Sequence, residues 1–378
     1  MTLDFLQHYW FVVVALLGGL LVFLMFVQGA NTQLVRKGMS DMQRRMVVNS
    51  TGRKWELGFT TLVTFGGAFF ASFPLFYSTS FGGAYWVWML LLLTFVFQAV
   101  SYEFQNKRGN LVGSRAFQWF LALNGILAPL LIGTAVGTFF TGSDFRVNTL
   151  ALALETTPTV SAWGNAWHGL EAVPTPALLL GLAVMFLDMC LGSLYIINNI
   201  DDTPTVAAAR KSLRWQSPLF LLALVAWLAF MLTTEGYAVD DGGNVTLVAH
   251  KYAQNLLHIP AALALLVAGA LLVALGLWQG LFTKSLRGIW PAGMGTVLVV
   301  VALFLVAGLN GTAYYPSRTH LPSSLTLANS SSSPFTLKAM FVVSLLVPFV
   351  VAYIAYVWRK MDKKPITPDE MQGPSDKY

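Results

Sequence analysis

The stretch from Tyr9 to Gln28 reads YWFVVVALLGGLLVFLMFVQ and contains no charged side chain. A helix needs about 20 mostly apolar residues to cross the roughly 30 Å hydrocarbon core of a bilayer. No basic segment precedes this stretch, and its apolar run is longer than the 7–15 residues typical of a signal peptide. The sequence therefore predicts a retained membrane-spanning helix at the N-terminus.

Comparable apolar stretches recur along the rest of the chain. The further expected spans are Gly58–Phe76, Phe81–Val100, Ala116–Phe140, Pro176–Ile200, Ser217–Thr233, Ile259–Leu281, Ile289–Leu309 and Thr336–Trp358. The composition agrees with this, because 56% of the residues are hydrophobic and only 11% are charged, against about 25% charged in soluble domains. We expect an all-α integral membrane protein with about nine transmembrane helices.

The basic residues set the expected orientation. The chain has 23 lysines and arginines, and all but four fall in one alternating set of connections and in the C-terminal tail. The four exceptions are Arg146, Lys251, Arg318 and Lys338. Loops rich in Lys and Arg stay in the cytoplasm, so the N-terminus is expected outside and the C-terminus inside. Because the basic residues are dispersed and form no patch, the net charge of +6 does not indicate nucleic-acid binding.

A weak internal similarity suggests how the spans are grouped. The first and fifth spans both end in polar residues, at Gln28–Asn31 and Asn198–Asp202, and a basic loop follows each. Two similar halves are a known plan in membrane proteins. The expected division is 1–140 (first four-helix unit), 141–175 (outside loop), 176–309 (second four-helix unit), 310–335 (outside loop), 336–358 (ninth helix) and 359–378 (cytoplasmic tail).

The histidines argue against a haem held by this chain. The five are His8, His168, His250, His258 and His320. All are expected in outside loops or at outside helix ends, whereas a haem in a helix bundle needs axial ligands that face its core. Met185 and Met189 are interpreted as packing residues. Cys190 is the only cysteine, which leaves no cysteine-based metal site.

Two carboxylates are candidates for proton uptake. Glu56 begins the second expected span and Glu103 ends the third, and a tight turn joins these spans. Both acids are therefore expected at the same cytoplasmic boundary. Two nearby carboxyl groups raise one pKa, which suits proton transfer near neutral pH. The alternative is that each acid is a solvated charge at a helix end, paired with Lys54 or Lys107.

Asp188 is the third candidate, because it lies at the centre of the fifth expected span. A charge there costs at least about 2.5–3.5 kcal/mol, so ionisable residues inside a membrane usually have a function. Asp188 could make a structural hydrogen bond to a neighbouring helix, relay protons or contact a quinone. It would also suit a secondary transporter or permease, which is the main alternative class for the whole chain.

Three motifs in the first 140 residues resemble those of a known family. Residues 49–74 contain Asn-Ser, then Trp55-Glu56, then GGAFFASFP. Residues 97–103 read FQAVSYE, and residues 129–137 read PLLIGTAVG. These runs resemble N-S…W-D/E…G-G-A-L-F-A-A-F/W-P, F-R-P-x-G-F-D/E and P-L-x-x-G-x-A-x-G of cytochrome bd quinol oxidase subunit II. The rest of the chain resembles that family in topology only.

The chain departs from the family pattern at three polar positions. Where the family has D-G-F-D-L-G at the end of its first helix, residues 28–33 read QGANTQ, so Gln28 and Asn31 replace both acids. Gln98 replaces an arginine of the family. These amides and Trp55 are therefore supporting candidates, while Glu56 and Glu103 keep the acidic character of their motif.

The resemblance implies a haem-free second subunit of a quinol oxidase in the bacterial cytoplasmic (inner) membrane. In that family a homologous subunit I carries two haems b and one haem d, and a small single-helix subunit can be attached. The complex oxidises quinol, reduces O2 and takes its protons from the cytoplasm. Subunit II contributes to proton uptake and in some complexes binds a structural quinone. Carried over, Glu56 and Glu103 become proton-entry candidates, with a purely structural scaffold as the alternative role.

Overall fold

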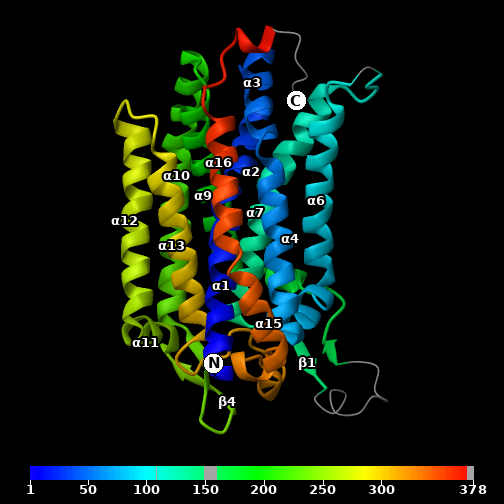
Figure 1. The fold of residues 1–378 in the computed structure, drawn as a ribbon, viewed down its shortest axis with the longest axis vertical. Helices are drawn as coiled ribbons and strands as arrows, with labels where there is room; N and C mark the ends of the chain where they lie inside the picture. Colours follow the sequence, from blue (N-terminus) through cyan, green and yellow to red (C-terminus); the bar gives the residue numbers. More distant parts are fainter. Residues whose placement is uncertain (108, 149–159, 373–378) are drawn as a thin grey trace.

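The chain forms one bundle of long helices that run along a common axis (Figure 1). We describe a computed structural model, which covers residues 1–107, 109–148 and 160–372. The long helices are α1 (Leu3–Leu24), α4 (Trp55–Ser72), α6 (Tyr85–Phe104), α7 (Ser114–Thr141), α9 (Ala177–Asn199), α10 (Thr203–Thr233), α12 (Pro260–Phe282) and α13 (Ile289–Gly308). The shorter helices are α2 (Phe26–Asn31), α3 (Asp41–Gly52), α5 (Pro74–Tyr77), α11 (Lys251–His258), α14 (Leu327–Ser330), α15 (Pro334–Ser344) and α16 (Val347–Met361).

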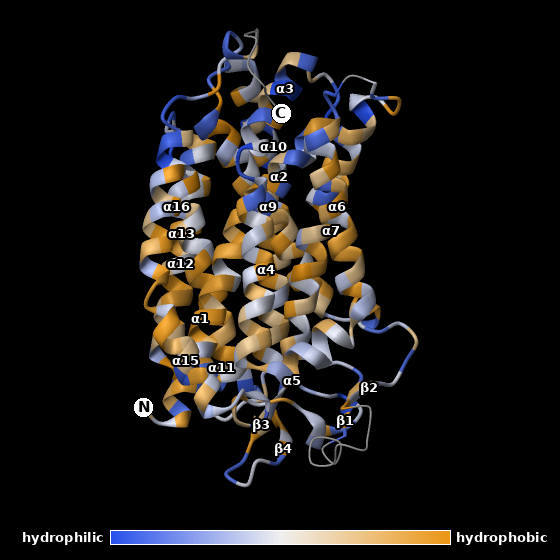
Figure 2. Ribbon diagram, turned by 45° about the vertical axis from the view of Figure 1, so that its right-hand side comes forward, coloured by the Kyte–Doolittle hydropathy of each residue, from blue (hydrophilic) through white to orange (hydrophobic). Residues whose placement is uncertain are grey.

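The middle of the bundle is apolar and its two ends are polar (Figure 2). Within the described residues, seven helices are long and apolar enough to cross a membrane, and α15 with α16 would make an eighth. The first of the seven runs on through α2 to Val35. Helix α4 is not among them, because its 18 residues include Glu56 and several threonines and glycines. The chain is thus a multi-pass membrane protein.

Several predicted helix boundaries were wrong. The second span ends at Ser72 and not at Phe76, because Pro74 lacks an N–H and pushes Phe73 out of the helical conformation. The third begins at Tyr85, after a turn that contains Phe81. The sixth begins at Thr203, 14 residues before the predicted Ser217, since Asp202 caps a helix that extends beyond the apolar stretch.

The other differences lie in the ninth span and in the loops. The ninth span is not one straight helix, because α15 and α16 meet at a bend of 40°. The basic loop after the first span contains α3, which begins with a capping box at Ser40 and Gln43. The outside loops contain two antiparallel strand pairs that the sequence analysis did not predict: β1 (Phe145–Val147) with β2 (Ser161–Trp163), and β3 (Glu235–Val239) with β4 (Val245–Ala249).

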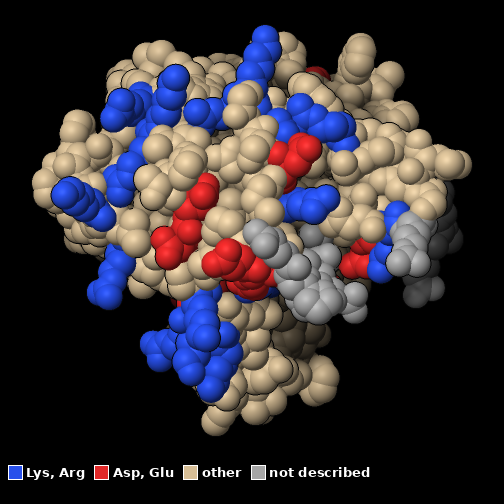
Figure 3. All heavy atoms as spheres, turned by 90° about the horizontal axis from the view of Figure 1, so that it is seen from above, with Lys and Arg blue, Asp and Glu red and all other residues tan. Residues whose placement is uncertain are grey.

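The two ends of the bundle differ in charge. We call the end that carries α3 and the C-terminal end of α16 the α3 end, and the end that carries the N-terminus and the strands the strand end (Figure 1). Seen from above, the α3 end carries many lysines and arginines (Figure 3). The four predicted exceptions, Arg146, Lys251, Arg318 and Lys338, belong to elements of the strand end. Arg108 and Lys377 lie outside the described residues.

Glycines allow the central helices to pack closely. Helix α9 packs against α7, α10 and α2, and α1 packs against α13. A Cβ atom on Gly29 of α2 would overlap the backbone carbonyl of Asp188 in α9, and a Cβ atom on Gly125 of α7 would overlap the carbonyl of Gln28. Only glycine permits these approaches, as in other membrane bundles. The polar helix α2 is consequently held inside the protein. The division into two four-helix units and a ninth helix stays a prediction.

Candidate functional site

Glu56 and Glu103 lie at the α3 end, on α4 and α6, and both are exposed. The residues just before them are in contact, since the rings of Trp55 and Tyr102 stack with centroids 5.9 Å apart. In the described part of the chain neither glutamate makes an ion pair. The alternative pairing of Glu56 with Lys54 is wrong, because Lys54 pairs with Asp362.

Three amide side chains meet beside this stacked pair, in the interior. Gln28 and Asn31 come from α2 and Gln98 comes from α6, and all three are fully buried. Gln28 Nε2 donates a hydrogen bond to Gln98 Oε1 at 3.2 Å, and Tyr102 Oη donates one to Asn31 Oδ1 at 3.0 Å. The structure therefore brings together all four predicted supporting residues, Trp55, Gln98, Gln28 and Asn31. We call Gln28, Asn31 and Gln98 the amide cluster.

The amide cluster and Trp55 have hydrogen-bonding capacity to spare. Gln28 Oε1, Asn31 Nδ2, Gln98 Nε2 and Trp55 Nε1 are all buried and have no hydrogen-bond partner among the described residues. Buried polar atoms in folded proteins nearly always bond to protein or to ordered water. A buried water molecule needs about two to four polar partners, and here α2 offers two such atoms and α4 and α6 one each. The cluster is therefore suited to holding water within the bundle.

Polar groups continue from the amide cluster toward the middle of the bundle. Thr94, Gln98 and Tyr102 are four residues apart on α6 and so share one face of that helix. Asn124 of α7 donates to Thr94 Oγ1 at 3.2 Å, and its own Oδ1 has no partner in the part of the chain that is described. From Tyr102 to Thr94 this face extends about 12 Å along the helix axis. It forms a polar path that leads inward from the α3 end.

Asn124 and Thr94 were not predicted as site residues. A second set that the sequence analysis missed is Gln33, Ser193 and Gln216, in which Gln33 Nε2 donates to Ser193 Oγ at 2.8 Å and Ser193 Oγ donates to Gln216 Oε1 at 2.6 Å. Single polar residues in long apolar stretches were the available signal. Such residues are common in membrane helices, so the signal does not show which of them meet.

Asp188 is fully buried near the middle of α9. Neither of its carboxylate oxygens has a hydrogen-bond partner among the residues described, so a structural hydrogen bond to a neighbouring helix, one of the three alternatives for Asp188, is not observed. Its backbone lies against Gly29, which is next to Gln28 of the amide cluster. Asp188 thus packs next to the cluster through its backbone, although no hydrogen bond between described residues links the two.

The potential metal and haem ligands lie away from these residues. All five histidines belong to elements of the strand end: the start of α1, the two ends of α11 and the segments before the 3-10 turns at Leu170 and Leu321. Met185, Met189 and Cys190 are buried in α9 among other side chains. In the ranges that the structure covers, no three His, Cys, Asp or Glu side chains are grouped to hold a metal ion.

Comparisons with known proteins agree with the resemblance seen in the sequence. The profile of the family described as "Cytochrome bd terminal oxidase subunit II" matches residues 6–361. The chain is 27% identical to "Cytochrome bd-I ubiquinol oxidase subunit 2" of Escherichia coli (strain K12) over 365 residues, covering 93% of each chain. It is 26% identical to "Cytochrome bd ubiquinol oxidase subunit 2" of Bacillus subtilis (strain 168), covering 96% of this chain and 99% of that one.

A solved structure has the same fold. The chain matches a chain of the bd oxidase from Geobacillus thermodenitrificans with a TM-score of 0.62 at 13% sequence identity, covering 94% of this chain and 98% of that one. At this identity the match concerns the fold alone. The helical bundle described above is therefore an arrangement that a bd oxidase chain adopts.

Proposed function

Because the chain belongs to the cytochrome bd terminal oxidase subunit II family, it is the second subunit of a cytochrome bd-type quinol oxidase, and we propose that it takes up protons at its α3 end. One observation carries this proposal: Trp55 Nε1 and one atom of each amide in the cluster are buried without a hydrogen-bond partner among the described residues, and Trp55 stacks on Tyr102 just before Glu56 and Glu103 in the chain. The match along nearly the whole chain favours this role over that of a permease.

The proposed path begins at exposed carboxylates and ends inside the bundle. Glu56 and Glu103 exchange protons with water at the α3 end, as carboxylates do. Amide side chains do not titrate, but they orient water through their donors and acceptors. Water held by Gln28, Gln98 and Asn31 would pass protons inward along the polar face of α6. Asp188 is proposed as a further relay group, since its buried carboxylate has no hydrogen-bond partner within the described ranges.

The proposed orientation places the α3 end in the cytoplasm. The basic residues gather at that end, which the positive-inside rule assigns to the cytoplasmic side. The N-terminus is then outside, and α4 together with the bent pair α15–α16 completes nine spans. We propose the bacterial inner membrane as the location. Quinol oxidases of this family oxidise quinol and reduce O2 in that membrane.

The haems are proposed to lie in the partner, subunit I, as two haems b and one haem d. In this chain all five histidines are at the strand end, so imidazole ligands do not face each other across the bundle. The chain is therefore proposed to bind no haem itself. A small single-helix subunit is a further proposed partner.

A structural quinone is a separate proposal. A cavity of about 190 Å³ lies among α1, α4, α7, α9, α10, α12 and α13, and its walls are apolar except for Thr296, with leucine and valine the commonest residues. The hydroxyl of Thr296, which lines it, already donates to Ala292 of its own helix. The apolar walls suit part of the isoprenoid chain of a quinone. They offer no free polar group that could bond the carbonyl oxygens of the quinone ring.

The experiment that tests proton uptake compares Glu56→Gln and Glu103→Gln with Asp369→Asn in the assembled oxidase. Asp369 is exposed at the same end and makes no ion pair with a described residue. Loss of a group that transfers protons typically costs 10²-fold or more, so we expect Glu56→Gln to lower quinol oxidation by about tenfold or more. The haem absorption spectrum should stay unchanged, and Asp369→Asn should have parental activity.

The scaffold role makes the opposite prediction. If both glutamine variants assemble with full haem content and oxidise quinol at the parental rate across the pH range, the carboxylates do not conduct protons. The chain would then support subunit I without contributing to proton uptake.

A further inference from the structure

Lys54 is a buried lysine at the corner between α3 and α4. Its side chain is 0% exposed, and Nζ lies 2.6 Å from Asp362 Oδ1. The ammonium also lies over the rings of Tyr195 and Trp358, 5.8 and 5.4 Å from their centroids. Burial lowers the pKa of Lys54, and the Asp362 carboxylate partly opposes this by favouring the charged form. An ammonium enclosed in this way depends on its partner.

Asp362 begins a segment that folds back onto the α3 end. We call residues 362–372 the C-terminal strap. Ile366, in its middle, is fully buried, and its backbone N–H donates to Asn199 O at 2.8 Å. The N–H of Asp201 donates to Ile366 O at 2.8 Å, so the strap pairs with the end of α9 like a short parallel strand. Glu370 forms a second ion pair with Arg53, at 2.5 Å.

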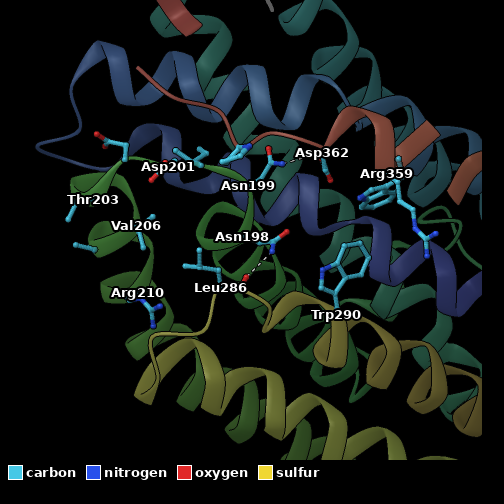
Figure 4. A pocket seen from close by; sticks show the side chains of 15 residues that line it. Asn198, Asn199, Asp201, Thr203, Val206, Arg210, Leu286, Trp290, Arg359 and Asp362 are labelled. Atoms are coloured by element: carbon cyan, nitrogen blue, oxygen red, sulfur yellow. Dashed lines mark hydrogen bonds between the residues drawn. The ribbon is translucent and has the colours of Figure 1, made fainter. Parts of the chain in front are cut away.

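Asp362 also connects the strap to α3 through Asn199. Asn199 Nδ2 donates to Asp362 Oδ1 at 2.9 Å, and Ser50 Oγ donates to Asn199 Oδ1 at 2.5 Å. Figure 4 shows Asn199 and Asp362 facing each other at the edge of a cavity of about 920 Å³. One carboxylate oxygen therefore receives bonds from two elements, α9 and the α3–α4 corner, and holds them together.

The corner held by Asp362 leads directly to the proposed proton entry. Lys54 is followed by Trp55 and Glu56, and the Trp55 ring stacks on Tyr102, whose hydroxyl donates to Asn31. A shift of the corner would move the Trp55 ring and the first turn of α4 with it. The contacts thus run from the strap through Lys54 and the stacked rings to the amide cluster.

We infer that Lys54 and Asp362 are positioning residues, through which the C-terminal strap sets the geometry of the proton entry at Glu56 and Trp55. This inference rests on the proposed function and adds the strap to it. Neither residue is proposed to carry the proton. Their role is to hold α4 in the register that keeps Trp55 stacked on Tyr102, with Glu56 at the next position of the helix.

The test uses the assembled oxidase with Asp362→Asn, and Asp369→Asn as the matched control in the same strap. We expect Asp362→Asn to lower turnover at saturating quinol by about tenfold, within the 10²-fold that a misplaced group can cost. Because uptake is first order in protons, the alkaline limb of the pH profile should move about one unit lower for each tenfold loss. Lys54 should also become reactive to a water-soluble acylating reagent, detected by mass spectrometry. Asp369→Asn should change none of these.

Two results would overturn the inference. One is an Asp362→Asn oxidase with reduced yield but parental turnover and pH profile, which would make the ion pair purely structural. If Asp362→Asn does not assemble, the double variant Lys54→Met/Asp362→Leu removes both charges without leaving one buried alone. Parental turnover of that variant is the second such result, whereas a tenfold loss with normal haem content supports positioning.

Glu56→Gln, measured in parallel, separates this inference from the proposed function. Slow turnover of Glu56→Gln with parental turnover of Asp362→Asn refutes positioning by the strap and leaves proton uptake through Glu56 intact. Parental turnover of Glu56→Gln refutes the proposed function itself.

Discussion

Single polar residues inside the helical bundle are the main basis for the proposed proton uptake. Leaving a buried donor or acceptor without a partner costs about 1–3 kcal/mol, so evolution has a reason to remove such groups unless they are used. Here Gln28, Asn31, Gln98 and Trp55 each keep an atom without a partner in the described part of the chain, and contacts among these side chains and Tyr102 bring them into one region. That concentration is better explained by bound water than by poor packing, because the surrounding apolar side chains are closely packed.

Asp188 gives a prediction at this scale. Since its oxygens have no partner in the described structure, Asp188→Asn should assemble normally and keep its thermal stability. If Asp188 relays protons, turnover should fall at least several-fold, most strongly at alkaline pH. Thr296→Val is the control, because Thr296 is equally buried and bonds only within its own helix. Equal turnover in Asp188→Asn and Thr296→Val would remove Asp188 from the pathway.

Sequence reasoning could find the site residues only in part. Glu56, Gln98, Gln28 and Asn31 could be found because they stand in recognisable motifs. The partner of Lys54 could not, since Asp362 lies 308 positions away and no local pattern connects the two. For the same reason Glu56 was given the wrong possible partner.

At the scale of helices, close packing of α2 decides where the amides lie. Helix α2 is short and ends in a polar sequence that would be expected at a membrane surface. Gly29 and Gly125 let it approach α9 and α7 until backbones touch, which turns its amides inward. The sequence identifies these glycines as packing residues, but their partners depend on how distant helices cross.

Gly29→Ala tests this packing. The added Cβ atom would overlap the Asp188 carbonyl, so α2 must move away from α9. Overpacking of this kind costs about 1–3 kcal/mol, and more where backbone opposes backbone. We expect a lower melting temperature and reduced assembly with subunit I. Gly67→Ala on α4 is the control, because nothing lies within 4 Å of its added Cβ atom. Equal stability of the two variants would mean that α2 is not packed as described.

Helix boundaries show what local rules can and cannot predict. Most apolar spans lie within a few residues of the observed helices, since an apolar stretch of that length has to be helical in lipid. Helix α10 is much longer than its apolar stretch, because the Asp202 cap and tertiary contacts extend it. The bend between α15 and α16 was missed because the whole stretch is apolar. Hydropathy gives no information on the direction of the helix axis.

At the scale of the molecule, charge asymmetry relates the bundle to the membrane. Basic residues at the α3 end and longer polar loops at the other end were both expected from the sequence, whereas the strands in those loops were not. The positive-inside rule counts the basic residues of whole connections between spans. Errors in the predicted helix ends therefore do not change the predicted orientation. The internal site required the three-dimensional structure, because it draws on α2, α4, α6 and α7 together.

The proposed orientation of the bundle in the membrane can be tested by labelling a cysteine at each end. A cysteine introduced at Asp369, in a chain whose Cys190 is replaced by Ala, should react with a membrane-impermeant thiol reagent only after the cytoplasmic face is exposed. A cysteine introduced at Asn244, in the turn between β3 and β4, should react in intact cells from which any outer membrane has been removed. The reverse pattern would place the α3 end outside and refute proton uptake from the cytoplasm.

The central claim is that protons enter through the amide cluster. The most direct measurement is proton uptake from the α3 side, followed with a pH-sensitive dye when O2 is pulsed onto the reduced oxidase in vesicles. Replacing both hydrogen-bonded amides in Gln28→Leu/Gln98→Leu leaves neither glutamine buried without the other and so should preserve assembly. We expect uptake at least about tenfold slower than in the parent, with an unchanged haem spectrum. Uptake at the parental rate in a fully assembled double variant would contradict it.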